Sequence, residues 1–309
     1  MRPGTLRVAA AQLPACASDL DANVSCAEEA VHAASLAGAE LLVLPELTTL
    51  PYFCAEAPAP YRSWAEPIDG PLVARFAALA GQLGMSIVLG LFELDPLTGA
   101  RHNAAVVFAS DGGIAPAVDR TGASRATDRK LHLPVGDEPS PGFDEPAHFE
   151  AGTGLGVHTL ARVQLGCLIC YDRRFPECWR ELRALDAQVV AVPIAGSGGD
   201  SPDFFISELR THARENGLVA IAASKIGAEC VAGRATQNLG NSCIVDAAGD
   251  VLAHRPGGEG AGLLIADIDL TAIASTRARL RYFEHRRVDL FGGPLHVPRI
   301  ELPAQAVIA

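Results

Sequence analysis

Lysine is almost absent from this sequence: only Lys130 and Lys225 occur among 309 residues, and arginine supplies nearly all the other positive charge. Asp and Glu (36) outnumber Lys and Arg (25), which gives a net charge of −11, and no basic cluster is present. A nucleic-acid or anionic-membrane surface is therefore not expected. Apolar runs do not exceed strand length and the amino terminus reads directly into a strand, which predicts no membrane span, no signal peptide and a cytoplasmic location.

Cysteine occurs eight times, but the pattern does not predict disulfides. The chain is long and lacks a recognisable secretion signal, so most cysteines are expected to be reduced and packed in the core. Cys167 and Cys170 form a C-x-x-C pair, yet no second pair at comparable spacing completes a zinc site. The pair also ends an apolar run, whereas a thioredoxin-type pair opens a helix. Neither a metal nor a redox role is favoured, and no cofactor is predicted.

The apolar segments alternate between strand and helix patterns, which predicts a layered α/β fold in one domain over residues 1–309. A hairpin signal at Asp111-Gly112 indicates that part of the sheet is antiparallel. Helices are expected from Asp19 or Asp21 to about Gly38, over 71–83, and around residues 179–185 and 205–213. The predicted strands span residues 6–13, 41–44, 86–92, 104–109, 189–192, 218–223, 244–246, 251–253 and 263–268.

Cys170 is the most informative single residue. It follows the apolar run 163–169 and precedes Tyr171-Asp172-Arg173-Arg174-Phe175-Pro176-Glu177. A cysteine at the end of a strand, with guanidinium groups beside it and a Pro-started helix beyond, is a candidate nucleophile, because positive charge and a helix N-terminus both favour the thiolate.

Two further polar residues lie in comparable places. Glu46 follows the apolar run 41–45, at the kind of strand end where α/β proteins carry functional groups. Lys130 lies in Arg129-Lys130-Leu131-His132-Leu133-Pro134. In a chain that otherwise uses arginine, a lysine at this point indicates a need for a compact, titratable charge.

In order and surroundings, these residues resemble the Glu-Lys-Cys triad of the nitrilase superfamily, the carbon–nitrogen hydrolases. The likeness extends from the opening strand at 7–12 to the segment 285–290. It implies an α-β-β-α sandwich of two mixed sheets flanked by helices, where composition alone would equally allow a doubly wound sheet. It also implies a homodimer or a higher homo-oligomer, with the tail 290–309 packing on a partner subunit.

The resemblance implies a metal-independent thiol hydrolase that cleaves a non-peptide C–N bond of a small amide or N-carbamoyl amino acid and releases ammonia. Cys170 would form the thioester, Glu46 would carry protons, and Lys130 with the backbone N–H of Tyr171 would stabilise the oxyanion. A second glutamate is also implied: Glu145 fits its position best, and Glu138 is the alternative. An acyltransferase with the same triad, nitrile hydrolysis and a catalytically idle binding subunit are the alternative functions.

The residues after Cys170 bear on the substrate. Tyr171-Asp172 is similar to the amidase and N-carbamoyl amino acid hydrolase branches. By the same likeness, Arg174 would bind a substrate carboxylate bidentately. The alternative is that Arg173 or Arg174 pairs with Asp172 or Glu177 and braces the turn.

By analogy with the same family, an apparent insertion at 119–128 and the segment 195–200 are expected to line the pocket.

Overall fold

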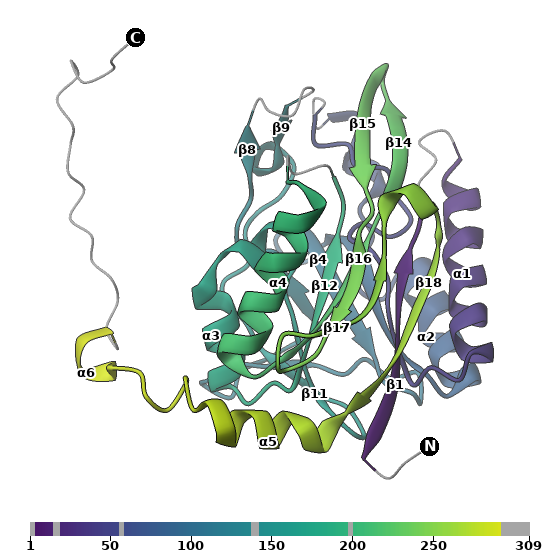
Figure 1. The fold of residues 1–309 in the computed structure, drawn as a ribbon. Helices are drawn as coiled ribbons and strands as arrows, with labels where there is room; N and C mark the ends of the chain where they lie inside the picture. Colours follow the sequence, from purple (N-terminus) through teal and green to yellow (C-terminus); the bar gives the residue numbers. More distant parts are fainter. Residues whose placement is uncertain (1–3, 15–18, 56–58, 137–141, 197–199, 292–309) are drawn as a thin grey trace, which may run out of the picture.

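The computed structural model describes residues 4–14, 19–55, 59–136, 142–196 and 200–291. Two mixed sheets face each other, and helices cover their outer faces (Figure 1). Helices α1 (Leu20–Leu36) and α2 (Pro71–Leu83) pack on the six-stranded sheet. Helices α3 (Pro176–Ala184) and α4 (Pro202–Asn216) pack on the eight-stranded sheet. This arrangement confirms the predicted α-β-β-α sandwich.

The six-stranded sheet has the order β18-β1-β2-β3-β4-β7. Its central strands β1, β2 and β3 are parallel, and the outer strands β18, β4 and β7 pair antiparallel. Parallel neighbours with apolar residues on both faces are typical of a sheet buried on both sides. The strands of this sheet are β1 (Thr5–Gln12), β2 (Leu41–Val43), β3 (Ser86–Leu94), β4 (Arg101–Phe108), β7 (Thr127–Arg129) and β18 (Gly262–Asp269).

The eight-stranded sheet has the order β17-β16-β13-β12-β11-β10-β5-β6. Strands β11, β12 and β13 form its parallel centre. The strands of this sheet are β5 (Ala117–Val118), β6 (Ser124–Arg125), β10 (Val157–Thr159), β11 (Gln164–Cys167), β12 (Val189–Ile194), β13 (Val219–Ser224), β16 (Ser242–Val245) and β17 (Val251–Arg255).

Smaller elements lie outside the two large sheets. The hairpin of β14 (Ile226–Val231) and β15 (Arg234–Leu239) projects beyond one end of the sandwich (Figure 1). The other small elements are β8 (Val135–Gly136), β9 (Phe143–Asp144), α5 (Leu270–Leu280), α6 (Val288–Phe291) and the 3-10 turns η1 (Ala59–Trp64), η2 (Glu145–Ala147), η3 (Cys170–Arg174) and η4 (Gly257–Glu259).

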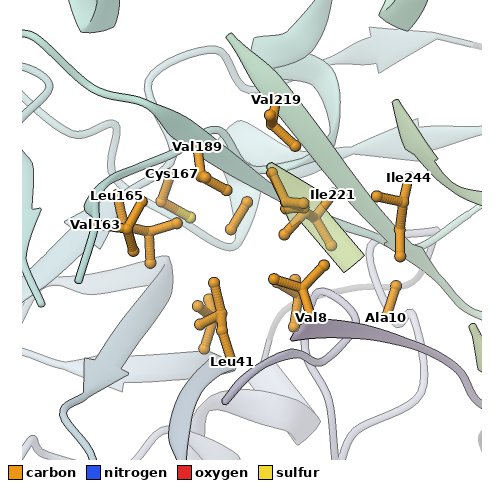
Figure 2. Packing of buried hydrophobic residues seen from close by; sticks show 14 of the residues in the cluster. Val8, Ala10, Leu41, Val163, Leu165, Cys167, Val189, Val219, Ile221 and Ile244 are labelled. Carbon is orange, nitrogen blue, oxygen red and sulfur yellow. The ribbon is translucent and has the colours of Figure 1, made fainter. Parts of the chain in front are cut away.

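The main core lies between the two sheets. Val8, Ala10 and Leu41 come from the six-stranded sheet and meet Val189 and Ile221 of the eight-stranded sheet (Figure 2). Strand side chains alternate between faces, so the intervening Ala9, Ala11 and Leu42 point instead to α1 and α2. Burial on both faces fixes the register of these strands, because a slip by one residue would exchange the two cores.

Several elements match the sequence-based predictions. Helix α2 spans the predicted residues, and Asp19 caps α1 by accepting a hydrogen bond from the Ala22 amide. Sequence patterning missed the β14–β15 hairpin and α5. Of the helices in the described part of the chain, none combines the length and apolar character needed to cross a bilayer.

Two further predictions concern residues 119–128 and the tail 290–309. The prediction that residues 119–128 line the pocket is wrong: they form the turn and the second strand of the β5–β6 hairpin at the edge of the larger sheet and then enter β7. The short turn at Asp119 closes this hairpin through hydrogen bonds to Thr121 and Ala123. Most of the tail 290–309 lies outside the described residues, which end at 291.

Candidate active site

Glu46 lies in the turn that follows β2. Its loop is held against β3 because the Thr48 amide donates to Gly90 O (3.1 Å) and the Gly90 amide donates to Thr48 Oγ1 (3.0 Å). The Glu46 side chain is fully buried and accepts three hydrogen bonds. Asn103 Nδ2 (2.6 Å) and Lys130 Nζ (2.9 Å) donate to Oε1, and the Ala195 amide (2.7 Å) donates to Oε2. These donors fix the orientation of the carboxylate.

Lys130 directly follows β7, and alternation along this strand explains its direction. Thr127 and Arg129 both bind Glu93 on one face, so Lys130 points to the opposite face. Its buried Nζ lies 2.9 Å from Glu46 Oε1 and 2.7 Å from Glu145 Oε1. Burial alone would lower the pKa of Lys130, but the two carboxylates raise the pKa well above its usual value. The ammonium form is therefore retained in the site.

Glu145 opens the turn η2 and is the second carboxylate beside Lys130. Its Oε1 also accepts a hydrogen bond from Tyr52 Oη (2.9 Å). Burial raises the pKa of Glu145 to about 7, although Lys130 opposes this change. Its Oε2 is buried without a hydrogen-bond partner among the described residues. Glu138, the alternative from the sequence, lies outside the described residues.

Cys170 begins the turn η3 with a φ of +49°, a left-handed conformation that is strained for a residue with a side chain. Its Sγ donates to Ala195 O (3.4 Å), and the amide of the same Ala195 donates to Glu46. Burial and the nearby Glu46 carboxylate raise the pKa of the thiol to about 12, against the influence of Lys130. The resting group at neutral pH is therefore the thiol, and its proton must be taken during any attack.

Asp172 connects the cysteine turn to the lysine segment. Its carboxylate accepts hydrogen bonds from the amides of Leu131 (3.2 Å) and His132 (2.9 Å), the two residues after Lys130. His132 Nδ1 lies 2.8 Å from the same carboxylate, and the imidazole stacks on Phe175 at 3.5 Å. His132 thus makes a structural hydrogen bond beside the site.

We call Glu46, Lys130, Glu145 and Cys170 the reaction cluster.

A pocket opens beside the reaction cluster. It is lined by Glu145 and Cys170 of the reaction cluster and by apolar and charged residues from both halves of the chain, including Tyr52, Tyr171, Arg174, Ile194, Ala195, Gly196, Asp200, Phe205 and Leu239. The predicted contribution of 195–200 is confirmed for Ala195, Gly196 and Asp200, and residues 197–199 lie outside the described residues. Both predicted substrate-binding residues, Tyr171 and Arg174, line this pocket.

Arg173 and Arg174 form a second charged group with Asp200 and Glu208. Asp200 Oδ2 lies 2.9 Å from Arg173 Nη2 and 2.6 Å from Arg174 Nη2. Glu208 on α4 lies 3.0 Å from Arg173 Nε and 3.6 Å from Arg174 Nη1. We call these four residues the arginine–carboxylate cluster. The sequence-based alternative named other partners, Asp172 and Glu177, and Asp172 is engaged with the lysine segment instead.

Sequence reasoning missed three contributors to the site. Asn103 is a buried amide inside the apolar strand β4, and a lone asparagine there was the available signal. Tyr52 carries a buried hydroxyl, and Ala195 acts through its backbone, which leaves no trace in the residue type.

The seven cysteines in the described part of the chain are free, and no three His, Cys, Asp or Glu side chains there are grouped as metal ligands would be.

Comparisons of the sequence with a family model and with curated proteins agree with one another. Residues 7–278 match the family model described as Carbon-nitrogen hydrolase. The N-carbamoylputrescine amidase of Solanum lycopersicum is 31% identical over 296 residues, which cover 92% of this chain and 93% of that protein. The deaminated glutathione amidase of Rattus norvegicus is 32% identical over 280 residues, which cover 88% of this chain and 80% of that protein.

A solved structure shares the fold over most of the chain. It is a mutant of the amidase from Nesterenkonia sp. AN1, with the acetamide moiety of fluoroacetamide added covalently at the active-site cysteine. The two structures superpose with a TM-score of 0.73 at 26% identity, over 94% of this chain and 97% of the other.

Proposed function

Because the chain belongs to the carbon–nitrogen hydrolase family, we propose that it cleaves the C–N bond of a small amide or N-carbamoyl amino acid through a thioester on Cys170. The observation that carries this proposal is the buried contact of one ammonium with two carboxylates, Lys130 with Glu46 and Glu145, whose charges act on the Cys170 thiol. The covalent adduct on the cysteine of the Nesterenkonia amidase supports a nucleophilic role for the corresponding sulfur.

The first step is attack of Cys170 Sγ on the carbonyl carbon. A thiol with a pKa of about 12 needs a base as the S–C bond forms, and Glu46 is the carboxylate that interacts most strongly with it. Glu46 takes the thiol proton while the carbonyl π electrons move to oxygen. The ammonium of Lys130, together with the backbone N–H of Tyr171, stabilises this oxyanion.

Collapse of the tetrahedral intermediate breaks the C–N bond. The oxyanion re-forms the carbonyl, Glu46 returns its proton to the departing nitrogen, and ammonia leaves, with Cys170 held as a thioester. Glu46 then takes a proton from water as the water oxygen attacks the thioester carbon. Breakage of the C–S bond returns that proton to sulfur and restores the thiol, so the enzyme is unchanged after one turnover.

Glu145 acts beside these steps by holding Lys130. Its Oε1 accepts both Lys130 Nζ and Tyr52 Oη, so the ammonium is fixed from one side by Glu145 and from the other by Glu46. A cation held in place before the reaction stabilises the oxyanion without a reorganisation cost. Among the described residues, Oε2 of Glu145 has no hydrogen-bond partner, which leaves one acceptor for a substrate amide N–H.

Tyr171 and Arg174 are the proposed substrate-binding side chains. A guanidinium that recognises a carboxylate would select acidic amides or N-carbamoyl amino acids. Arg174 already pairs with Asp200, so a substrate carboxylate would have to share or displace that partner. The names of the two amidase relatives point to different substrates, N-carbamoylputrescine and deaminated glutathione, and choose neither for this chain.

Ammonia release from a panel of small amides, N-carbamoyl amino acids and nitriles tests the proposal. We expect turnover of at least one amide or carbamoyl compound, loss of turnover in Cys170→Ala, and an acyl adduct on Cys170 by mass spectrometry. Cys230→Ala removes an exposed cysteine on β14 and serves as the matched control. Full activity of Cys170→Ala would exclude the thioester, and transfer of the acyl group to an added amine would indicate an acyltransferase.

A further inference from the structure

The second lysine of the chain is also buried in an ion pair. Lys225 follows β13, and its side chain and that of Glu229 are both fully shielded from solvent. Lys225 Nζ lies 3.4 Å from Glu229 Oε1 and also donates a hydrogen bond to Leu50 O. Desolvating a charged pair is expensive, and breaking one by removing a single partner is strongly destabilising. Neither residue lines the pocket or takes part in the reaction described above.

Both members of this pair bind the segment that carries Tyr52. Lys225 binds the Leu50 carbonyl, and Glu229 Oε2 accepts the Tyr52 amide. The pair therefore holds the backbone of residues 50–52 at two points. The peptide of Lys225 itself also supports the site, because its amide donates to Ile194 O (3.0 Å), next to the Ala195 that contacts Cys170 and Glu46.

Tyr52 transmits this placement to the reaction cluster. Its hydroxyl donates to Glu145 Oε1, the same oxygen that lies 2.7 Å from Lys130 Nζ. Burial and the Glu145 carboxylate raise the pKa of the phenol well above its usual value, so Tyr52 stays a donor. A buried aromatic side chain has little freedom of its own, and the hydroxyl position is set by the backbone at residue 52.

We propose that Lys225 and Glu229 are positioning residues for catalysis, which hold Tyr52 so that its hydroxyl orients Glu145 and, through Glu145, the Lys130 ammonium. This inference rests on the proposed function, since it concerns the same site. Two buried lysine–carboxylate groups then serve one reaction: Lys130 contacts the reacting atoms, and Lys225 acts at a distance through one hydroxyl.

A double-mutant cycle between Glu229→Gln and Tyr52→Phe tests this. Each single variant is expected to lower kcat about 10-fold or more with KM within about threefold, because hydrogen bonds to charged groups are worth roughly that factor. In the Tyr52→Phe background, Glu229→Gln should lower kcat by less than about threefold, because the hydroxyl it positions is gone. Glu40→Gln, which breaks the surface pair with Arg162 at the opposite end of β2, is the matched control.

Three outcomes would overturn the proposal. Tyr52→Phe could keep the wild-type kcat, Glu229→Gln could keep it, or Glu229→Gln could cost the same factor in both backgrounds, as a purely structural residue would. If Glu229→Gln does not fold, Lys225→Met takes its place in the same cycle, and the same outcomes overturn the proposal. Activity of Cys170→Ala would instead defeat the proposed function, so the two failures are distinguishable.

Discussion

The reaction cluster and the arginine–carboxylate cluster border one pocket but are built differently. The side chains of Glu46, Lys130 and Glu145 are at most 1% exposed, whereas Arg174 and Asp200 are 22% and 14% exposed. Glu46 and Lys130 follow β2 and β7, and Glu145 and Cys170 begin the turns η2 and η3, whereas the second group joins η3 to Asp200 and to Glu208 within α4. Under the proposed function, the reaction cluster is fixed by buried contacts, and substrate choice depends on the partly solvated ion pair of Arg174 and Asp200, which is weaker and easier to change.

Replacing Lys130 with methionine should give the largest effect. Loss of one oxyanion donor alone lowers kcat about 100- to 1,000-fold. The two carboxylates that remain buried without their cation should also destabilise the fold by about 3–5 kcal/mol. Ammonia release and urea unfolding measure the two losses separately.

Arg129→Met is the matched control for this variant, because Arg129 is the neighbouring cation on the opposite face of β7 and pairs with Glu93. It should lower stability but leave kcat within a fewfold of wild type. An equal loss of kcat in both variants would mean that the strand as a whole, and not the Lys130 ammonium, supports the reaction.

Gly90→Ala tests whether the sheet fixes Glu46. A Cβ at residue 90 would lie 2.4 Å from Pro45 O and 2.9 Å from Glu46 Cα, so the loop that carries Glu46 must move. Overpacking of this kind costs about 1–3 kcal/mol, and we expect kcat to fall about 10- to 100-fold. Gly258→Ala is the control, since an added Cβ there meets no atom within 4 Å. Wild-type kcat in Gly90→Ala would show that the Glu46 loop tolerates displacement.

Asp200→Asn tests the second cluster and should alter substrate choice more than rate. Removing this charge leaves Arg174 with less internal compensation, so a substrate carboxylate gains a partner. We expect kcat/KM for an N-carbamoyl amino acid to rise about 10-fold relative to an uncharged amide, which is the order of one charge-assisted hydrogen bond. Adding Arg174→Leu should cancel the gain. An unchanged ratio would remove Arg174 from substrate recognition.

The smallest effect concerns the pH dependence of stability. His158 Nε2 lies 2.6 Å from Asp128 Oδ2 and its Nδ1 lies 2.7 Å from Ala115 O, so both nitrogens face acceptors, an arrangement that favours the doubly protonated ring. Burial and Arg125 lower the pKa of His158, but Asp128 raises it above 6.5 overall. This contribution to stability is complete below the unfolded pKa and is lost as pH rises through the folded one.

Urea unfolding between pH 6 and 9 measures this loss. His158→Gln should be less stable than the wild-type protein at pH 6, by on the order of 1 kcal/mol, and its stability should depend less on pH. Glu145 adds a pH dependence of the same sign. Because burial raises its pKa from 4.5 to about 7, the free energy of unfolding falls as pH rises from about 4.5 to 7. Glu145→Gln removes this contribution and so separates it from that of His158. An unaltered slope in His158→Gln would show that the imidazole is neutral.

Local sequence signals were enough to predict several helices and strands of this structure. Proline and glycine mark both ends of α2, and Asp19 caps α1, because these signals act within a few residues. The β14–β15 hairpin was missed because its residues alternate weakly between small and polar types. The role of residues 119–128 was misjudged for a similar reason: an extra hairpin at a sheet edge and a pocket loop have the same composition.

Residue patterns along the chain were enough to indicate the layered α/β fold, the strand ends at Glu46 and Cys170, and the residues that bear charge. Folding in three dimensions was needed to show which other residues contact them: Asn103 and Ala195 donate to Glu46 across 57 and 149 residues, and Tyr52 donates to Glu145 across 93. The physical reason is that a strand's periodicity is local, whereas a hydrogen bond between distant segments depends on the register of two packed sheets, which burial of the whole core fixes at once.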